Sequence, residues 1–243
     1  MNTTIKEQNK KLLESSVKEG RDTIDAGIQR AFPTFPPRPC NGGPLEKAVA
    51  KDGGWFYEPK YNGWRTLIHV PTKRMFNRKG DPLSIAHEFP VALEALKRAW
   101  ARGNLSRAGD TVEWVDCEAL ARRHKMGKGS LIVLDGVMEG TYGERRSRLR
   151  PVFPMLGMPP WCLNLGAAGL ANLKEIPEDN GLYLTPRIVG NKNALVAWRA
   201  MQGKGYGDFF EGLVAKHEQS RYPIQLQSPS MEYNFWIKHR WAY

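Results

Sequence analysis

The arrangement of apolar and polar residues divides the chain into an N-terminal helical stretch and a longer region of short strands. Between residues 5 and 31, apolar residues recur at three- and four-residue steps among charged ones, which is the spacing of an amphipathic helix. Four prolines between Phe32 and Pro39 then break this periodicity and predict an extended connector. We therefore expect residues 1–44 to form a helical extension with a proline-rich connector, and residues 45–243 to form the main domain.

The main domain alternates strand-like runs with a few helical segments. Helical character is found at residues 89–100, 144–149 and 193–201, and Pro151 is expected to stop the second of these. Runs rich in β-branched and aromatic residues predict strands at 55–57, 66–70, 73–76, 111–120, 130–137, 182–188, 213–215 and 233–241. Because helices and strands are mixed and neighbouring strands are hairpin-like, we expect an α+β fold with antiparallel sheets rather than a doubly wound parallel sheet.

The net charge of +11, with 36 Lys and Arg against 25 Asp and Glu, points to a polyanionic partner such as nucleic acid. No apolar run approaches the roughly 20 residues that span a bilayer, and residues 1–30 lack the apolar core of a signal peptide. We expect no membrane partner and a cytoplasmic location, in a bacterial or phage-infected cell or near the nucleoid. Cys40, Cys117 and Cys162 form no metal-ligand pattern, which argues against structural zinc.

The most distinctive motif is the hexapeptide Lys60-Tyr-Asn-Gly-Trp-Arg65, which places a lysine, a turn and an arginine after an apolar strand. A neutral lysine amine is a good nucleophile toward the α-phosphate of a nucleotide, and the product is a phosphoramidate. Gly63 allows the backbone to approach a nucleotide closely. Cationic side chains elsewhere would neutralise the charge of the transferring phosphate and the leaving pyrophosphate. The motif therefore predicts covalent nucleotidyl transfer at Lys60.

Several other segments follow this motif in a fixed order. They are residues 76–80, 115–120, 131–135, 144–149, 211–216, 220–222 and 236–240. Together with the hexapeptide, this succession resembles the nucleotidyltransferase (adenylation) domain of ATP-dependent DNA ligases, a family of the covalent nucleotidyltransferase superfamily. The likeness extends over roughly residues 45–243. It implies an ATP-grasp-like adenylation domain built on antiparallel sheets.

The resemblance implies a role for each matching residue of the first half of the domain. Lys60 matches the residue that becomes adenylated, and Glu58 matches the position that helps to read the adenine edge. Arg65 matches the arginine beside the ribose and the DNA end. Arg78 matches the arginine that binds the 5′-phosphate or the AMP phosphate, and Glu118 matches the acidic residue on the ribose side.

The second half of the domain would complete the site. Glu211 matches the metal-side carboxylate, and Glu118 is a second candidate ligand for Mg²⁺, with Mn²⁺ as an alternative ion. Lys238 and Arg240 match the paired lysines that contact the α-phosphate. Lys216 is a further candidate for nucleotide binding, and a solvated cation is the alternative interpretation.

The implied activity is that of an ATP-dependent DNA ligase or its catalytic domain. Lys60 would attack ATP to give lysyl-AMP, AMP would pass to a 5′-phosphate at a nick in double-stranded DNA, and the 3′-hydroxyl would displace AMP. We expect a monomer. An RNA ligase or capping-type transferase uses the same lysine chemistry and remains an alternative. A nucleic-acid end-binding protein that keeps the pocket without turnover is another.

The sequence also departs from the family pattern. Asn62 stands where the family usually has Asp, and Cys117 stands where it usually has Gly. Leu134 occupies the place of an aromatic residue that stacks on adenine, so we expect a ring from elsewhere, with Tyr57 as the candidate. Trp236 is expected to pack in the core. Because the sequence ends shortly after Trp236, we expect no C-terminal OB-fold in this chain.

Overall fold

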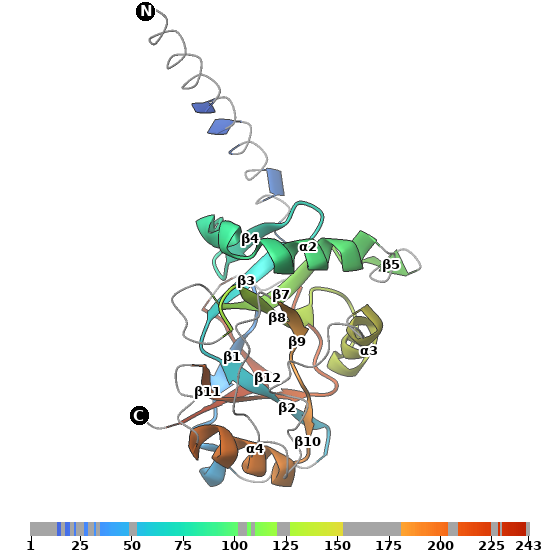
Figure 1. The fold of residues 1–243 in the computed structure, drawn as a ribbon. Coiled ribbons are helices and arrows are strands. Elements are labelled where there is room, and N and C mark those ends of the chain that lie inside the picture. Colours follow the sequence, from blue (N-terminus) through green and yellow to red (C-terminus); the bar gives the residue numbers. More distant parts are fainter. Residues whose placement is uncertain are drawn as a thin grey trace, which may run out of the picture.

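The computed structural model describes residues 14–15, 18–19, 22, 27–28, 32, 35–48, 53–101, 106–107, 110–120, 127–152, 181–203, 209–224, 228 and 230–241. Within the predicted N-terminal helix, the described residues are all helical. They lie along a line that leads away from the rest of the molecule (Figure 1). At the end nearest the domain, Ile28 is buried against Leu67, Phe76 and Trp114, so this part of the extension packs on the sheet.

Two five-stranded sheets form the body of the protein (Figure 1). The first sheet has the order β1-β12-β11-β2-β10, and the second has the order β4-β3-β7-β8-β9. The first consists of β1 (Arg38–Asn41), β2 (Trp55–Tyr61), β10 (Ile188–Val189), β11 (Phe210–His217) and β12 (Glu232–Arg240). The second consists of β3 (Trp64–His69), β4 (Arg74–Asn77), β7 (Trp114–Leu120), β8 (Ser130–Gly136) and β9 (Leu182–Leu184). A separate hairpin joins β5 (Ser106–Arg107) to β6 (Asp110–Thr111).

Antiparallel pairing dominates both sheets. Only the β1–β12 and β8–β9 pairs are parallel among the described pairs of strands. The predicted α+β class with antiparallel sheets is therefore confirmed. The neighbouring strands β3 and β4 pair antiparallel, in agreement with the hairpin-like character of neighbouring strands in the sequence.

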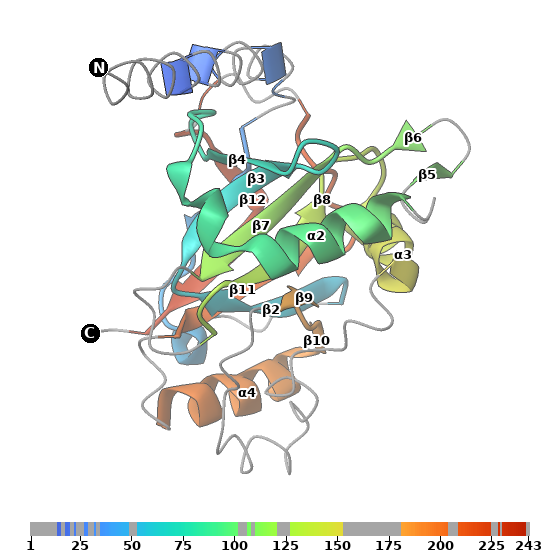
Figure 2. The ribbon, with the colours of Figure 1, turned by 45° about the horizontal axis from the view of Figure 1, so that its top comes forward.

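Each sheet has one face covered by a helix (Figure 2). Helix α2 (Pro90–Ala99) packs on the second sheet through Leu93 and Leu96, which contact the buried side chains of β3, β7 and β8. Helix α4 (Asn191–Gly203) packs on the first sheet. Its Trp198 belongs to the same apolar cluster as the residues of β2 and β11 that face the helix. Burial of apolar side chains between helix and sheet is the main stabilising contribution here.

The remaining helical elements are shorter or lie at one side. Helix α3 (Tyr142–Val152) contacts β8, and two short 3₁₀ helices, η1 (Leu45–Lys47) and η2 (Ser84–Glu88), precede β2 and α2. Helix α3 extends one residue past Pro151, where the sequence predicted a stop. None of the helices in the described part of the chain has the length and apolar character needed to cross a membrane.

The structure divides the predicted strand at 182–188 into two strands that belong to different sheets. Strand β9 pairs with β8, whereas β10 pairs with β2. Pro186 lies between them, and because proline has no backbone N–H it cannot continue a ladder. The chain thus passes from the second sheet to the first at this point.

The chain passes between the sheets a second time at the bend Asn62-Gly63. Strand β2 ends at Tyr61 in the first sheet, and β3 begins at Trp64 in the second. The backbone N–H of Asn62 donates a 2.8 Å hydrogen bond to the carbonyl of Phe209, beside the start of β11. The two ends of the Lys60–Arg65 motif therefore lie on different sheets.

A candidate nucleotide-binding site between the two sheets

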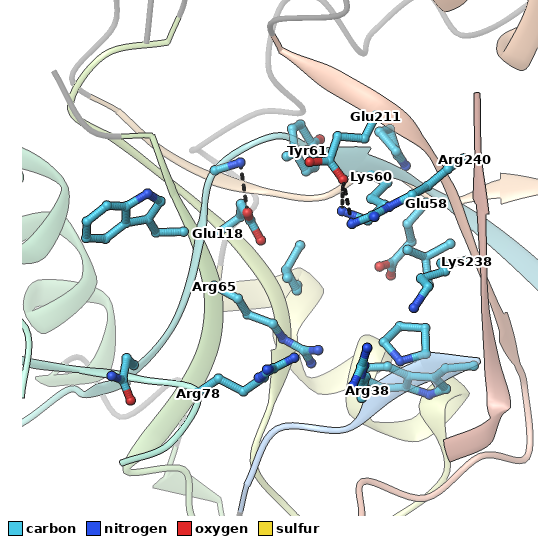
Figure 3. A pocket seen from close by; sticks show the side chains of 18 of the residues that line it. Arg38, Glu58, Lys60, Tyr61, Arg65, Arg78, Glu118, Glu211, Lys238 and Arg240 are labelled. Atoms are coloured by element: carbon cyan, nitrogen blue, oxygen red, sulfur yellow. Dashed lines mark hydrogen bonds and ion pairs between the residues drawn. The ribbon is translucent and has the colours of Figure 1, made fainter. Parts of the chain in front are cut away.

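A pocket of about 610 Å³ lies between the faces of the two sheets that the helices leave uncovered (Figure 3). This volume falls within the range of about 300–1,000 Å³ that is usual for small-molecule sites. All nine residues that the sequence proposed for the site line this pocket. They are Glu58, Lys60, Arg65, Arg78, Glu118, Glu211, Lys216, Lys238 and Arg240. Tertiary structure thus gathers residues that are up to 182 positions apart in the chain.

Lys60 is held by an ion pair with Glu211. The Lys60 Nζ atom donates to Glu211 Oε2, and the same oxygen lies 3.1 Å from a terminal nitrogen of Arg240 (Figure 3). The side chains of Lys60 and Glu211 are both about one-fifth exposed, so the pair lies at the wall of the pocket and is reachable from it.

A β-bulge in β11 brings Glu211 to the pocket. Val214 and Lys216 line the pocket, so strict alternation along the strand would place Gly212 on the pocket face and Glu211 on the opposite one. The register shifts just before Gly212, which pairs with Lys60, and leaves Glu211 as the extra residue. A bulge of this kind redirects a side chain, and here it directs the carboxylate to Lys60.

Glu118 closes the pocket on the side of the second sheet. Its Oε1 accepts a 2.9 Å hydrogen bond from the backbone N–H of Gly63 (Figure 3). Burial raises the pKa of Glu118 to about 7, although the nearby charges of Lys60 and Arg65 act in the opposite direction. Glu118 is therefore not a solvent-exposed charge at the end of a strand. Because its pKa is about 7, its carboxyl group changes charge near neutral pH.

Arg65 is fixed by a buried carboxylate. Its Nε atom donates a 2.9 Å hydrogen bond to Asp116 Oδ1, a terminal nitrogen donates to Oδ2 of the same residue, and another donates to the carbonyl of Pro37. The Tyr222 hydroxyl donates a further 2.9 Å bond to Asp116. Because Asp116 is fully buried, this bidentate pair sets the position of the guanidinium in the pocket wall.

Lys216 and Glu58 form a buried pair on the floor of the pocket. Lys216 Nζ lies 2.9 Å from Glu58 Oε2 and 3.1 Å from the carbonyl oxygen of Leu134, and both charged side chains are 2% exposed. The Tyr142 hydroxyl donates to the other oxygen of Glu58. The Lys216 ammonium also lies 4.2 Å from the centre of the Trp236 ring. Lys216 is thus a buried structural cation as well as a lining residue, and not a solvated one.

The Lys216–Glu58 pair adjoins a second buried ion pair, which Asp135 forms with Arg145. Asp135 lies 3.7 Å from Lys216 Nζ and accepts two 2.9 Å hydrogen bonds from the guanidinium of Arg145 on α3. Arg145 also donates to the carbonyl oxygens of Gly140 and Ser220. These interactions satisfy the buried charges and join β8, β11 and α3 beneath the pocket.

The structure also shows which lining residues sequence reasoning missed or misplaced. Arg38 of β1 and Lys79 of the turn after β4 line the pocket, although neither was proposed. Tyr57, the suggested replacement ring, is buried in the cluster around α4 and does not belong to the lining. The alternation along β2 explains this, because Glu58 and Lys60 face the pocket and Tyr57 faces the other way. Trp236 is buried, as expected for core packing, and also lines the pocket.

The described residues hold no group of three or more His, Cys, Asp or Glu side chains that could enclose a metal ion. Mg²⁺ does not need such a cage, because it is often held by one or two carboxylates together with water and substrate phosphates. Both carboxylates that the sequence proposed as metal ligands, Glu211 and Glu118, line the pocket. Cys162 lies outside the described residues.

No family model and no curated protein matches this sequence. Solved structures do match. The ligase domain of M. tuberculosis LigD is 19% identical with a TM-score of 0.51, and the match covers 86% of this chain and 60% of that one. A structure named Pmar-Lig_PreS3 is 14% identical with a TM-score of 0.51, and the match covers 86% and 47%. The chain therefore spans 60% of the length of the first structure and 47% of the length of the second. At these identities the likeness concerns the fold alone, and this chain shares its fold with the matched part of the LigD ligase domain.

Proposed function

We propose that this protein is an ATP-dependent nucleotidyltransferase of the DNA ligase type, or the catalytic domain of one, that forms lysyl-AMP at Lys60. The observation that carries the proposal is the Lys60–Glu211 pair at the wall of a 610 Å³ pocket that is rich in cations. Eight cationic and four acidic side chains line this pocket among the described residues. Such a surplus of positive charge suits a polyphosphate substrate.

The chemistry can be written for the atoms of this site. Lys60 Nζ forms a bond to the α-phosphorus of ATP while the bond between that phosphorus and the bridging α–β oxygen breaks, and pyrophosphate leaves. The ammonium of Lys60 must lose one proton before Nζ can attack, and Glu211 Oε2 is the acceptor that already contacts it. The attacking amine loses a second proton to solvent as the phosphoramidate forms. Arg240, which shares that oxygen, is placed to offset charge on the transferring phosphate.

The remainder of the pocket suits a nucleoside. Leu134 and Val214 supply apolar surface for a base, while Glu58 lies at the floor with one oxygen bound by Tyr142 and the other by Lys216. A carboxylate has about four lone-pair positions, so Glu58 retains acceptor capacity toward a base edge. A divalent ion bound by Glu211 or Glu118 would supply further neutralisation of phosphate charge.

A nucleic-acid partner follows from the charge of the whole chain and from the second and third steps of such a reaction. The net charge of +11 suits attraction to a phosphate backbone. We propose nicked double-stranded DNA as the partner, in which AMP passes from Lys60 to the 5′-phosphate and the 3′-hydroxyl then displaces AMP. Nicked RNA differs little in its phosphate chemistry, so it is the comparison substrate.

The decisive experiment is incubation with α-labelled ATP and Mg²⁺. We expect a labelled protein whose label is lost in Lys60→Ala and retained in Arg98→Ala, an exposed substitution in α2 that also removes one positive charge. If the wild-type protein takes up no label, the proposal of an enzyme fails and an end-binding protein is favoured. The same incubation with labelled GTP tests nucleotide choice, and sealing of nicked DNA and nicked RNA duplexes tests the partner.

A further inference from the structure

The cations of the pocket fall into two groups. Lys60 and Arg240 share Glu211, while Arg65 and Lys216 are paired with Asp116 and Glu58 respectively. The other group consists of cations that no carboxylate pairs with among the described residues. Its members are Arg38, Arg78, Lys79 and Lys238. A cation that lines a pocket without a counter-charge is available to a bound anion, whereas one that is already paired is less so.

Strand β1 holds Arg38 in a fixed position. Before Arg38, the carbonyl of Pro37 accepts a hydrogen bond from Arg65. After it, the backbone N–H of Gly42 donates a 2.9 Å bond to the carbonyl of Lys238. Prolines flank Arg38 on both sides and restrict the backbone further. All four residues of the strand pair with β12, with a shift of register between Pro39 and Cys40, so the strand is part of the sheet and not a loose connector.

A close approach at Gly42 shows how tightly β1 lies against β12. A Cβ atom at Gly42 would lie 2.5 Å from Ile237 Cγ2 and 2.6 Å from Cε1 of His239, so no larger residue fits without movement. His239 Nδ1 also lies 3.0 Å from the carbonyl oxygen of Gly43. A side chain carried by such an anchored strand can contact a ligand with little loss of conformational freedom.

Arg38 extends toward the same part of the pocket as Arg65 and Arg78, which come from the opposite sheet (Figure 3). Lys238 also lies near it. Burial lowers the pKa of Lys238, and the positive charges of Arg38 and Arg240 lower it further, while the carboxylate of Glu232 acts in the opposite direction. Like charges that are held close together repel one another, and a bound anion relieves this repulsion. The gathering of guanidinium groups from two sheets is the arrangement that a phosphate group requires.

We propose that Arg38 is a phosphate-binding residue of this pocket, supplied by the short strand β1 that precedes the nucleotidyltransferase motifs. This inference rests on the proposed function, because it assumes that the pocket binds phosphate-bearing substrates. Two sources of phosphate have the same chemistry, namely the nucleotide and the 5′ end of a nucleic acid. Arg38 binds one of them through paired N–H donors on its guanidinium group.

Binding measurements test this inference without relying on turnover. Titration calorimetry with ATP and with AMP, and a binding assay on nicked duplexes that carry a 5′-phosphate or a 5′-hydroxyl, are compared for the wild type and Arg38→Ala. We expect the substitution to weaken one of these interactions about tenfold, as for the loss of a charge-assisted hydrogen bond. Arg98→Ala, which removes a charge from an exposed residue that does not line the pocket, is expected to bind like the wild type.

The pattern of loss identifies the phosphate. A larger loss for ATP than for AMP assigns Arg38 to the β- or γ-phosphate, and an equal loss for both assigns it to the α-phosphate. A loss confined to the phosphorylated nick assigns it to the 5′-phosphate. Arg38→Gln, which keeps the length of the side chain, provides the same comparison if Arg38→Ala does not fold, and Arg38→Lys is expected to recover part of the affinity.

Two results would overturn the inference in distinguishable ways. If the wild type binds ATP or the phosphorylated nick and the Arg38 variants bind them within about twofold of it, Arg38 is not a phosphate ligand and the proposed function stands. If the folded wild type binds none of the probes, both proposals fail together.

Discussion

Glu211 faces Lys60 because β11 bulges at Glu211 and not because the two residues would meet in a regular ladder. Gly212, the next residue, has a φ of +142°, and a Cβ atom there would lie 2.0 Å from the carbonyl oxygen of His239. The bulge thus depends on a glycine that permits both an unusual backbone conformation and a close approach of β12. The geometry of the candidate site is set by this local feature of the first sheet.

Gly212→Ala should therefore disturb the Lys60–Glu211 pair. The added methyl group cannot be accommodated unless β11 and β12 separate, and a displacement of about 1 Å at a reacting group can cost on the order of 100-fold in rate. The rate of protein labelling by α-labelled ATP measures this effect. Gly53→Ala is the matched control, because a Cβ atom at Gly53 meets nothing within 4 Å. A wild-type rate for a folded Gly212→Ala variant would contradict the role given to the bulge.

Gly63→Ala is expected to destabilise the protein where the chain passes from one sheet to the other. The new Cβ atom would lie 2.7 Å from the carbonyl oxygen of Ala119 and 2.8 Å from Cγ of Glu118. Overpacking of this kind typically costs about 1–3 kcal/mol in the free energy of unfolding. Urea denaturation measures the loss, and Gly53→Ala again serves as the control. A change of stability equal to that of the control would show that β3 and β7 can separate without cost.

Arg145→Ala should cause a larger loss, because it leaves Asp135 buried with only the more distant Lys216 as a counter-charge. Removal of one partner of a buried ion pair typically costs about 3–5 kcal/mol. Arg150→Ala removes the same charge from an exposed position of α3 and should change stability little. The comparison is made by thermal or urea unfolding. A combined Arg145→Ala and Asp135→Asn variant should regain part of the loss, since no uncompensated charge then remains.

Glu118 predicts a pH dependence of stability. Burial raises its pKa from 4.5 to about 7 in the folded protein, so the folded state holds this proton more tightly than the unfolded state. The resulting stabilisation is complete below pH 4.5 and is lost as the pH rises through about 7. Urea unfolding of the nucleotide-free protein across this window should therefore show a decrease of the free energy of unfolding that is absent in Glu118→Gln. Equal slopes for the two proteins would indicate that Glu118 titrates normally.

Local sequence patterns identified most of the secondary structure. The runs at 66–70 and 73–76 were correctly predicted as β3 and β4, because their composition and the turn between them are local properties. The helices α2 and α4 followed from their apolar spacing. The run at 182–188 failed as a single strand, since nothing in its composition tells which neighbouring strand each half will pair with. Strand β1 was missed because a proline-rich segment does not look like a strand, although it can pair at the edge of a sheet.

The sequence by itself determined the residue types of the candidate site and their order along the chain, because a lysine nucleophile, carboxylates and phosphate-binding cations are needed whatever the fold. Tertiary structure decided which of these side chains are paired and which are not. Only the folded sheets show that Lys216 is buried against Glu58, that the bulge directs Glu211 to Lys60, and that Arg38 enters the pocket from β1. These are contacts between residues far apart in sequence, and strand pairing fixes them.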